Sequence, residues 1–86
     1  MVINDLLIHV GNGHYVNPQR ILAISPPHVA ASRRAIAQAR LDGMLLDFRS
    51  GKKCMGIIIL DTGMVIKVAL RPRDIESSMT HNKSNE

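Results

Sequence analysis

Two neighbouring apolar segments most constrain what this chain can fold into. Ile57–Leu60 is apolar at every position, and Met64–Leu70 is interrupted only by Lys67. Successive side chains of a strand point to opposite faces of a sheet, so both faces of these two strands need a cover. The sequence Asp61-Thr62-Gly63 between them predicts the turn of an antiparallel hairpin.

The sequence predicts six short strands, at residues 6–10, 15–16, 20–24, 44–48, 54–60 and 64–70. Asn12-Gly13 joins the first two as a hairpin, because it supplies the positive φ that a tight turn needs. The third strand ends before Pro26-Pro27, since proline is not tolerated inside strands. We expect the last three strands to form an antiparallel meander, in which Ser50-Gly51 is the first turn.

One main helix is predicted over residues 29–41, with Gly43 as its left-handed C-terminal residue. Its packing side consists of Ser32, Ala35, Ile36 and Ala39. Pro72 begins a short second helix that reaches about Met79. The sequence therefore predicts one small α+β domain over residues 1–79, with a polar and disordered tail at residues 80–86.

The number of helices available to cover the sheet indicates whether the chain should self-associate. One helix of this length, with a short terminal helix, can cover a single face of the predicted sheet. A large exposed apolar face would be a liability for a monomer. We therefore expect a second copy of the chain to cover the other face, so that the protein is a homo-oligomer.

Composition excludes several classes of protein. Cys54 is the only cysteine, which rules out an intrachain disulfide and suits a reducing cytoplasm. The four histidines lack the spacing of a structural zinc site, so we expect no metal. No apolar run approaches the roughly 18 residues of a membrane span. The sequence offers no pattern for a cofactor or a small-molecule substrate, and we expect a cytoplasmic protein.

Positive charge is concentrated in one stretch of the chain. Residues 20–53 hold seven of the eleven basic residues, which are Arg20, Arg33, Arg34, Arg40, Arg49, Lys52 and Lys53. Such a basic patch indicates a polyanionic partner, although a solvated turn is the common alternative. Tyr15 and Phe48 are the only Phe, Trp or Tyr residues, which disfavours single-strand and RNA binding by stacking. Duplex DNA, bound through its phosphates, remains.

One motif suggests catalysis but lacks the necessary context. Leu60-Asp61-Thr62-Gly63 matches the Asp-Thr-Gly signature of aspartic proteases, in which two carboxylates share a proton and activate water. Those enzymes need many strands and a flap after the motif, and this chain is too short to supply them. No Ser/His/Asp or Cys/His set has a stronger case. We predict no catalytic residues and no enzymatic activity.

Short blocks along the chain match one known family in order and spacing. They are Val10-Gly11-Asn12-Gly13 with Val16, Arg20-Ile21, Ile24-Ser25-Pro26, Arg33-Arg34, Ile36, Ala39-Arg40, Gly43-Met44-Leu45 with Asp47, Gly51-Lys52-Lys53, Ile57-Ile58-Ile59 with Asp61, and Val65-Ile66. Over about residues 6–79 the chain resembles the RemA-type extracellular-matrix regulators of bacteria. This resemblance implies a small α+β protein that forms a ring, binds duplex DNA and controls transcription of matrix and biofilm genes in Bacillus relatives.

The resemblance also implies which residues bind DNA. Arg20 matches an arginine that precedes a strand, and Lys52 and Lys53 match an arginine pair after the glycine of a turn. Other basic residues that could support DNA binding are Arg33, Arg34 and Arg49. Lysine holds phosphate as a point charge whereas arginine binds it bidentately, so the substitution keeps charge but changes geometry. Cys54-Met55 also follows where the family commonly has another basic residue.

Two other functions are compatible with the sequence. The lysines, together with the absence of a recognition-helix pattern, would suit a nucleoid-type architectural protein with little sequence preference. A structural oligomer whose basic turn meets protein or RNA is the alternative from another class. The ability to bind DNA separates this last alternative from the other two, and preference for a specific promoter separates a regulator from an architectural protein.

Overall fold

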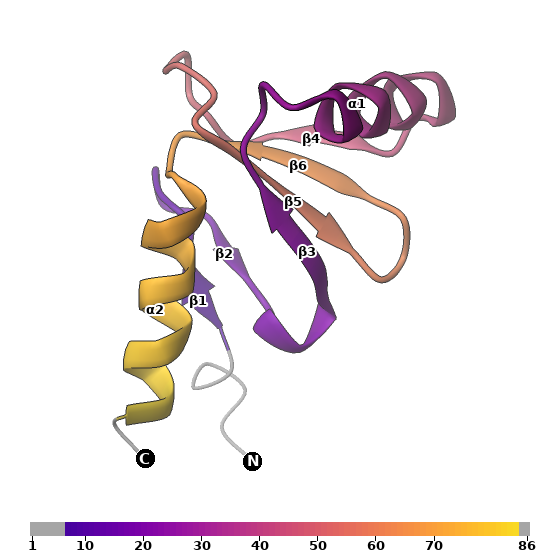
Figure 1. Ribbon diagram of the computed structural model, residues 1–86. Coiled ribbons are helices and arrows are strands. Elements are labelled where there is room, and N and C mark those ends of the chain that lie inside the picture. Colours follow the sequence, from indigo (N-terminus) through magenta and orange to yellow (C-terminus); the bar gives the residue numbers. More distant parts are fainter. Residues whose placement is uncertain (1–6, 85–86) are drawn as a thin grey trace.

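The computed structural model describes residues 7–84, and side chains for residues 7–79 (Figure 1). It has the expected α+β architecture. In chain order the elements are β1 (Ile8–His9), β2 (Tyr15–Val16), a short 3-10 helix (Pro18–Arg20), β3 (Ile21–Ser25), α1 (Ala30–Asp42), β4 (Leu45–Asp47), β5 (Gly56–Leu60), β6 (Val65–Val68) and α2 (Pro72–Ser84). Strands β1 and β2 form a separate hairpin, and the other four strands form one sheet in the order β3-β5-β6-β4.

The expected meander is wrong in one pairing. Strands β5 and β6 form the predicted antiparallel hairpin, with Ile58 opposite Ile66. Strand β4, however, runs parallel to β6, with Leu45 opposite Val65, and does not pair with β5. Strand β3 occupies the second edge of β5, so β4 cannot pair with β5 and pairs instead with the outer edge of β6. Helix α1 then connects β3 and β4 as the crossover between two parallel strands.

Both faces of the sheet are covered by the same chain. On one face, hairpin β1–β2 and helix α2 bury a cluster made of Ile8, Val10, Val16, Ile58, Ile66, Val68 and Ile75. On the other face, α1 covers Ile57 and Val65 through Ala39, with Ala35 and Ile36 packed alongside. Figure 1 shows α1 on one side of the sheet and α2 with the β1–β2 hairpin on the other. The expectation that one face needs a second subunit is therefore wrong, and self-association stays a prediction without that support.

Helix α1 follows the sequence closely. It ends at Gly43, whose φ of 69° is left-handed and whose N–H donates to the carbonyl groups of Ala39 and Arg40. Ser32 is buried on the packing side, and its hydroxyl oxygen lies 2.9 Å from that of Ser25 at the end of β3. One hydroxyl therefore donates to the other, which satisfies a polar group in the core. The predicted packing side of this helix is confirmed.

Helix α2 is longer than the sequence indicated. It begins at Pro72 as expected but continues to Ser84, beyond the predicted end near Met79. Residues 80–84 of the tail that was expected to be disordered are thus helical, while residues 85–86 lie outside the described residues. Ile75 is fully buried in the core and Met79 packs against it, which ties the helix to the β1–β2 hairpin.

Gly56 allows the chain to pass close to the start of α2. A Cβ atom at this buried position would lie 2.5 Å from the carbonyl oxygen of Leu70 and 3.4 Å from Cδ of Pro72. We expect Gly56→Ala to lower the free energy of unfolding by about 1–3 kcal/mol, since the backbone itself has to move. Chemical denaturation followed by circular dichroism measures this. Unchanged stability would mean that the start of α2 shifts freely.

Candidate nucleic-acid interface

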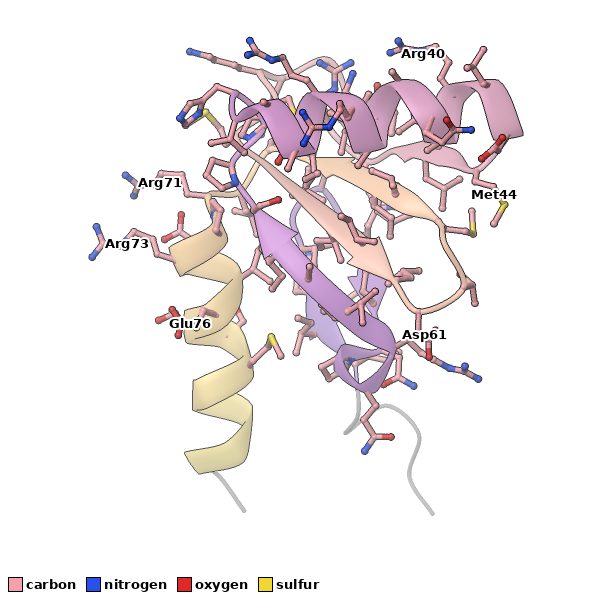
Figure 2. All side chains as sticks on the ribbon, turned by 45° about the vertical axis from the view of Figure 1, so that its right-hand side comes forward. Arg40, Met44, Asp61, Arg71, Arg73 and Glu76 are labelled. Atoms are coloured by element: carbon pink, nitrogen blue, oxygen red, sulfur yellow. The ribbon has the colours of Figure 1, made fainter. Side chains whose placement is uncertain are left out.

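Basic side chains from two segments meet at the end of the sheet where β4 and β6 finish. Lys52 and Lys53 lie exposed in the loop between β4 and β5. Arg71 and Arg73 are exposed at the start of α2 and line the same cavity as Lys53. Figure 2 shows both arginines pointing away from the body of the protein, with Asp61 at the opposite end. Lys52, Lys53, Arg71 and Arg73 are called the basic end below.

Both helices begin near the basic end. Helix α2 starts at Pro72, and α1 starts shortly after His28, two residues that line the cavity beside Lys53. The N-terminus of a helix carries partial positive charge, which adds to that of the side chains. Arg33 and Arg34 are exposed in the first two turns of α1. Their position makes them suitable to support an anion bound at this end.

A tight turn presents the two lysines. Ser50 and Gly51 have φ values of 53° and 79°, and the N–H of Lys52 donates to the carbonyl oxygen of Arg49 at 3.1 Å. The turn predicted from Ser50-Gly51 is therefore confirmed, although it does not join paired strands. Because successive positive φ values reverse the chain sharply, the turn holds Lys52 and Lys53 clear of the sheet.

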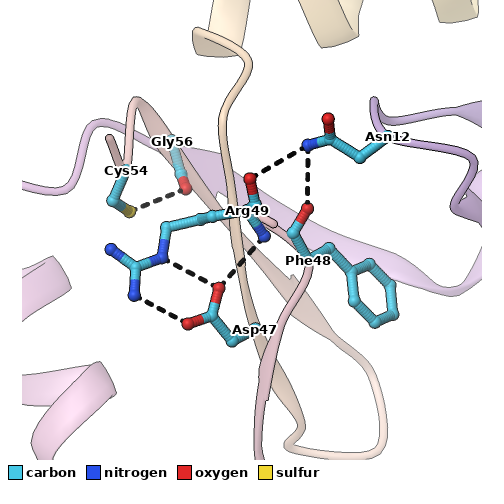
Figure 3. Close-up of polar contacts among 6 residues, drawn as sticks. All are labelled: Asn12, Asp47, Phe48, Arg49, Cys54 and Gly56. Atoms are coloured by element: carbon cyan, nitrogen blue, oxygen red, sulfur yellow. Dashed lines mark hydrogen bonds and ion pairs between the residues drawn. The ribbon is translucent and has the colours of Figure 1, made fainter. Parts of the chain in front are cut away.

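The first hairpin anchors the start of this loop. The amide of Asn12 donates to the carbonyl oxygens of Phe48 at 3.2 Å and Arg49 at 3.1 Å (Figure 3). The imidazole of His14 stacks on the ring of Phe48, with centroids 4.0 Å apart. The β1–β2 turn is thus tied to the segment that precedes the lysines. Sequence reasoning assigned Asn12 only to its own turn and missed this interaction.

Arg49 is held by a neighbouring carboxylate. Its Nε and Nη2 atoms donate to Asp47 at 2.8 and 2.7 Å, and its backbone N–H donates to the same group at 3.0 Å (Figure 3). The side-chain hydrogen bonds from Arg49, followed by the backbone one, hold the pKa of Asp47 well below its usual range. The carboxylate therefore stays ionised at neutral pH. Its contribution to folding stability is lost only as the pH falls below about 4. Arg49 thus has a partner within the protein, which limits the supporting role toward DNA that we expected of it.

Arg71 and Arg73 were missed by the sequence reasoning. Charge was counted along the chain, and the stretch that contains them has as many acids as bases. In the fold, Asp74 forms an ion pair with Arg71 at 3.4 Å, while Arg73 forms none with the described residues. The signal that could have found them was Arg71-Pro72-Arg73 itself, since a proline that begins a helix places flanking residues at its N-terminus.

Arg20 lies at the opposite end of the sheet. Its guanidinium group is 3.4 Å from the carboxylate of Asp61 in the β5–β6 turn, and its carbonyl accepts from the Asp61 N–H at 2.8 Å. The strand register explains the separation, because Ile21 pairs with Leu60 at one end of β5 and the lysine loop enters β5 at the other. A sheet can bring a strand end and a turn to one rim, but within a single chain Arg20 and the two lysines lie at opposite ends of the sheet.

Two further observations concern the described part of the chain. Neither helix within residues 7–84 is long and apolar enough to cross a membrane. Over those residues, His, Cys, Asp and Glu side chains form no group of three that could hold a metal ion.

A family model described as "Extracellular matrix regulatory protein A-like", or RemA-like, matches residues 7–79. Several relatives carry the name "Putative regulatory protein". One from Dehalococcoides mccartyi is 35% identical over 74 residues, which cover 86% of this chain and 77% of the relative. One from Synechococcus elongatus is 33% identical over 92% of this chain and 91% of the relative.

A third relative, from Alkaliphilus metalliredigens, is 32% identical over 98% of this chain and 90% of its own length, and has the same name. The matched region contains both helices' first turns and the whole four-stranded sheet. It therefore includes the basic end as well as Arg20. The family model and these relatives agree with the resemblance inferred from the short blocks, and the chain belongs to the RemA-like family, whose names are those of regulatory proteins.

Proposed function

We propose that the protein regulates transcription by binding duplex DNA through the phosphates at its basic end. The observation that carries this proposal is the convergence of Lys53, Arg71 and Arg73 on one cavity beside the N-termini of two helices, with Lys52 exposed next to Lys53 in the same loop. Exposed cations at one end neutralise phosphates and release counterions, which favours association with duplex. The regulatory names of the family and the relatives support this role.

The scarcity of aromatic side chains favours duplex DNA over single strands as the partner. Phe48 is already stacked on His14, and Tyr15 is exposed on β2 in the separate hairpin. Single-strand binders offer several rings on which bases stack, and this chain has no other Phe, Trp or Tyr residue. The proposed interactions are therefore made with the DNA backbone, without requiring unstacked bases.

We further propose that the DNA-binding form is a homo-oligomer, and the family resemblance implies a ring. Strand β3 is an outer strand of the sheet, and its residue Leu22 is 71% exposed. An outer strand with an exposed large apolar side chain favours packing against another copy. Repetition would also present Arg20 and the basic end several times along one duplex, although they lie apart in each subunit.

The resemblance extends to control of extracellular-matrix and biofilm genes, which we propose as the biological role. The lysine pair favours one alternative within the same class, a nucleoid-type protein with little sequence preference, because lysine provides charge without the bidentate geometry that reads guanine. Competition of a matrix-gene promoter fragment against bulk duplex separates the two. A regulator prefers the promoter, whereas an architectural protein binds both alike.

Fluorescence anisotropy with a duplex of about 30 base pairs tests the proposal, together with sedimentation of the protein with and without DNA. We expect saturable binding, a linear fall of log affinity with log salt, and a mass several times that of the monomer. A protein that fails to bind duplex at physiological salt would be the structural oligomer of the other class. A monomer that binds DNA would exclude the ring.

Asp47 provides a further test, because it restrains Arg49. We expect Asp47→Asn to raise duplex affinity and to steepen the salt dependence by up to about 0.9, the value for one neutralised phosphate. Asp42→Asn is the matched control, since it removes an exposed carboxylate at the far end of α1 whose partner is Gln38. Weaker binding by Asp47→Asn alone would instead assign the ion pair to organising the loop.

A further inference from the structure

An open cavity of about 610 Å³ lies beside Lys53 at the basic end. Three segments line it: residues 26–28 between β3 and α1, residues 53–55 before β5, and residues 71–73 at the start of α2. This volume falls within the roughly 300–1,000 Å³ of small-molecule sites. A duplex that lies across the surface needs no hollow of this size, so the cavity requires a separate explanation.

The floor of the cavity is apolar and rigid. It consists of Pro26, Pro27, Cys54, Met55 and Pro72, all of which are partly buried. The thiol of Cys54 donates to the carbonyl oxygen of Gly56 at 3.4 Å, and the tight approach at Gly56 fixes Pro72 against β5. Three prolines with restricted backbones and these two interactions leave the floor largely formed before a ligand arrives.

The rim of the cavity is cationic. Lys53, Arg71 and Arg73 are exposed around it, and His28 lies on the same rim. No carboxylate is among the described residues that line the cavity, and Asp74 engages Arg71 through a single ion pair at 3.4 Å. Two guanidinium groups can bind phosphate oxygens bidentately, and the N-terminus of α2 adds partial positive charge at Arg73.

These two parts together indicate the chemical class of the ligand. Inorganic phosphate would use only the rim, and so would the backbone of an intact duplex, whose bases are stacked away from the floor. A ligand that uses both parts carries a phosphate group and a body of nucleoside size that has an apolar face, such as the flat face of a purine ring. From this geometry we propose that the cavity binds a free purine nucleotide, with the phosphates on Arg71 and Arg73 and the base on the floor.

Binding of the nucleotide has a consequence for DNA that rests on the proposed function. Lys53 belongs both to this cavity and to the basic end, so a bound phosphate places negative charge where the DNA phosphates would lie. The nucleotide and duplex DNA therefore compete, and the cavity acts as an effector site. Nucleotide binding itself does not depend on whether the protein binds DNA.

Calorimetric titration of the full chain with ADP, GDP and inorganic pyrophosphate tests the proposal. We expect ADP or GDP to bind saturably and at least about tenfold more tightly than pyrophosphate, because only the nucleotides bury apolar surface on the floor. Arg73→Ala should weaken nucleotide binding by about tenfold or more. Arg40→Ala, which removes an exposed arginine near the far end of α1, is the matched control and should bind like the native chain.

Methyl NMR of the methionines separates the free nucleotide from the nucleotides of DNA. ADP or GDP should shift the methyl signal of Met55, whereas a blunt duplex should leave it in place. Met55→Ser should weaken nucleotide binding while pyrophosphate binding stays native, and circular dichroism confirms that the variant is folded.

Three results would overturn the proposal. In the first, ADP and GDP bind no more tightly than pyrophosphate. In the second, Arg73→Ala and Arg40→Ala lose the same amount of nucleotide affinity. In the third, the methyl signal of Met55 shifts when duplex is added but not when nucleotide is added. Failure of the proposed function gives a different pattern, in which nucleotide binds but duplex does not. If duplex binds and neither nucleotide does, the cavity proposal fails while the proposed function stands.

Discussion

Replacing Lys52 and Lys53 together by alanine is expected to weaken duplex binding by more than about tenfold at physiological salt. Both side chains are exposed on a tight turn and form no ion pair with the described residues, so their charge is free for phosphate. For each phosphate that is no longer neutralised, the slope of log affinity against log salt should fall by roughly 0.9. In an oligomer the change recurs in every subunit, which multiplies the effect. Anisotropy at several salt concentrations measures both quantities.

The assembly and the fold should be unaffected by this change, because exposed charges contribute little to folding. Sedimentation of the double variant checks the mass. The single variants Lys52→Ala and Lys53→Ala are compared with Arg40→Ala, which removes one exposed charge elsewhere. Lys52→Arg/Lys53→Arg should bind at least as tightly as the native chain, since guanidinium adds bidentate hydrogen bonds. If the alanine variant keeps native affinity and salt slope, the lysine turn is a solvated loop.

Elements whose signals are local could be predicted from the sequence. Gly43 ends α1 in the left-handed conformation, and the Asp61-Thr62-Gly63 turn joins β5 to β6, both as expected. Ser32 and Ala39 lie on the buried side of α1 because helical periodicity alone decides which side packs. In each of these cases the signal lies within a few residues of the element it predicts.

Pairing between strands could not be predicted in the same way. The residues of β4 identify it as a strand but do not choose its neighbour, and its parallel pairing with β6 goes with the pairing of β3 with β5, far away in the sequence. The packing of the β1–β2 hairpin and α2 on the second face of the sheet was missed for a related reason. The β1–β2 hairpin was assigned no packing partner, whereas Ile8 and Val16 belong to the same cluster as Ile75 of α2.

The candidate site was predictable in part. The turn that carries Lys52 and Lys53 was identified from its own residues, but Arg71 and Arg73 join it only through the fold. The pairing of Asp47 with Arg49 could have been anticipated, because the two residues are two positions apart on either side of Phe48. The end of the sheet at which Arg20 lies depends on the partner and direction of β3, and the residues next to Arg20 do not specify these.

Arg20→Ala is expected to weaken duplex binding strongly as well, even though Arg20 lies at the other end of the subunit. The guanidinium group is exposed beside Asp61, so it can exchange an internal ion pair for a phosphate at little cost to folding. If DNA binds both ends through repeated subunits, the salt slope should fall by roughly 0.9 for each phosphate that Arg20 no longer neutralises. Asp61→Asn is the control, because it frees Arg20 without removing it and should bind at least as tightly as the native chain.

Because Arg20 and the basic end lie apart within one subunit, a double-mutant cycle tests whether neighbouring subunits bring them together. Within one subunit Arg20 and Lys53 share no partner, so their losses in binding free energy should add to within about 0.5 kcal/mol. A larger coupling, with the oligomer intact, would place Arg20 of one subunit beside the basic end of another. Asp61→Asn also tests the prediction that the protein has no hydrolytic activity. Peptide cleavage by the native chain that disappears in this variant would contradict that prediction. If Arg20→Ala binds duplex with native affinity and salt slope, Arg20 is only the partner of Asp61, and duplex binding belongs to the basic end alone.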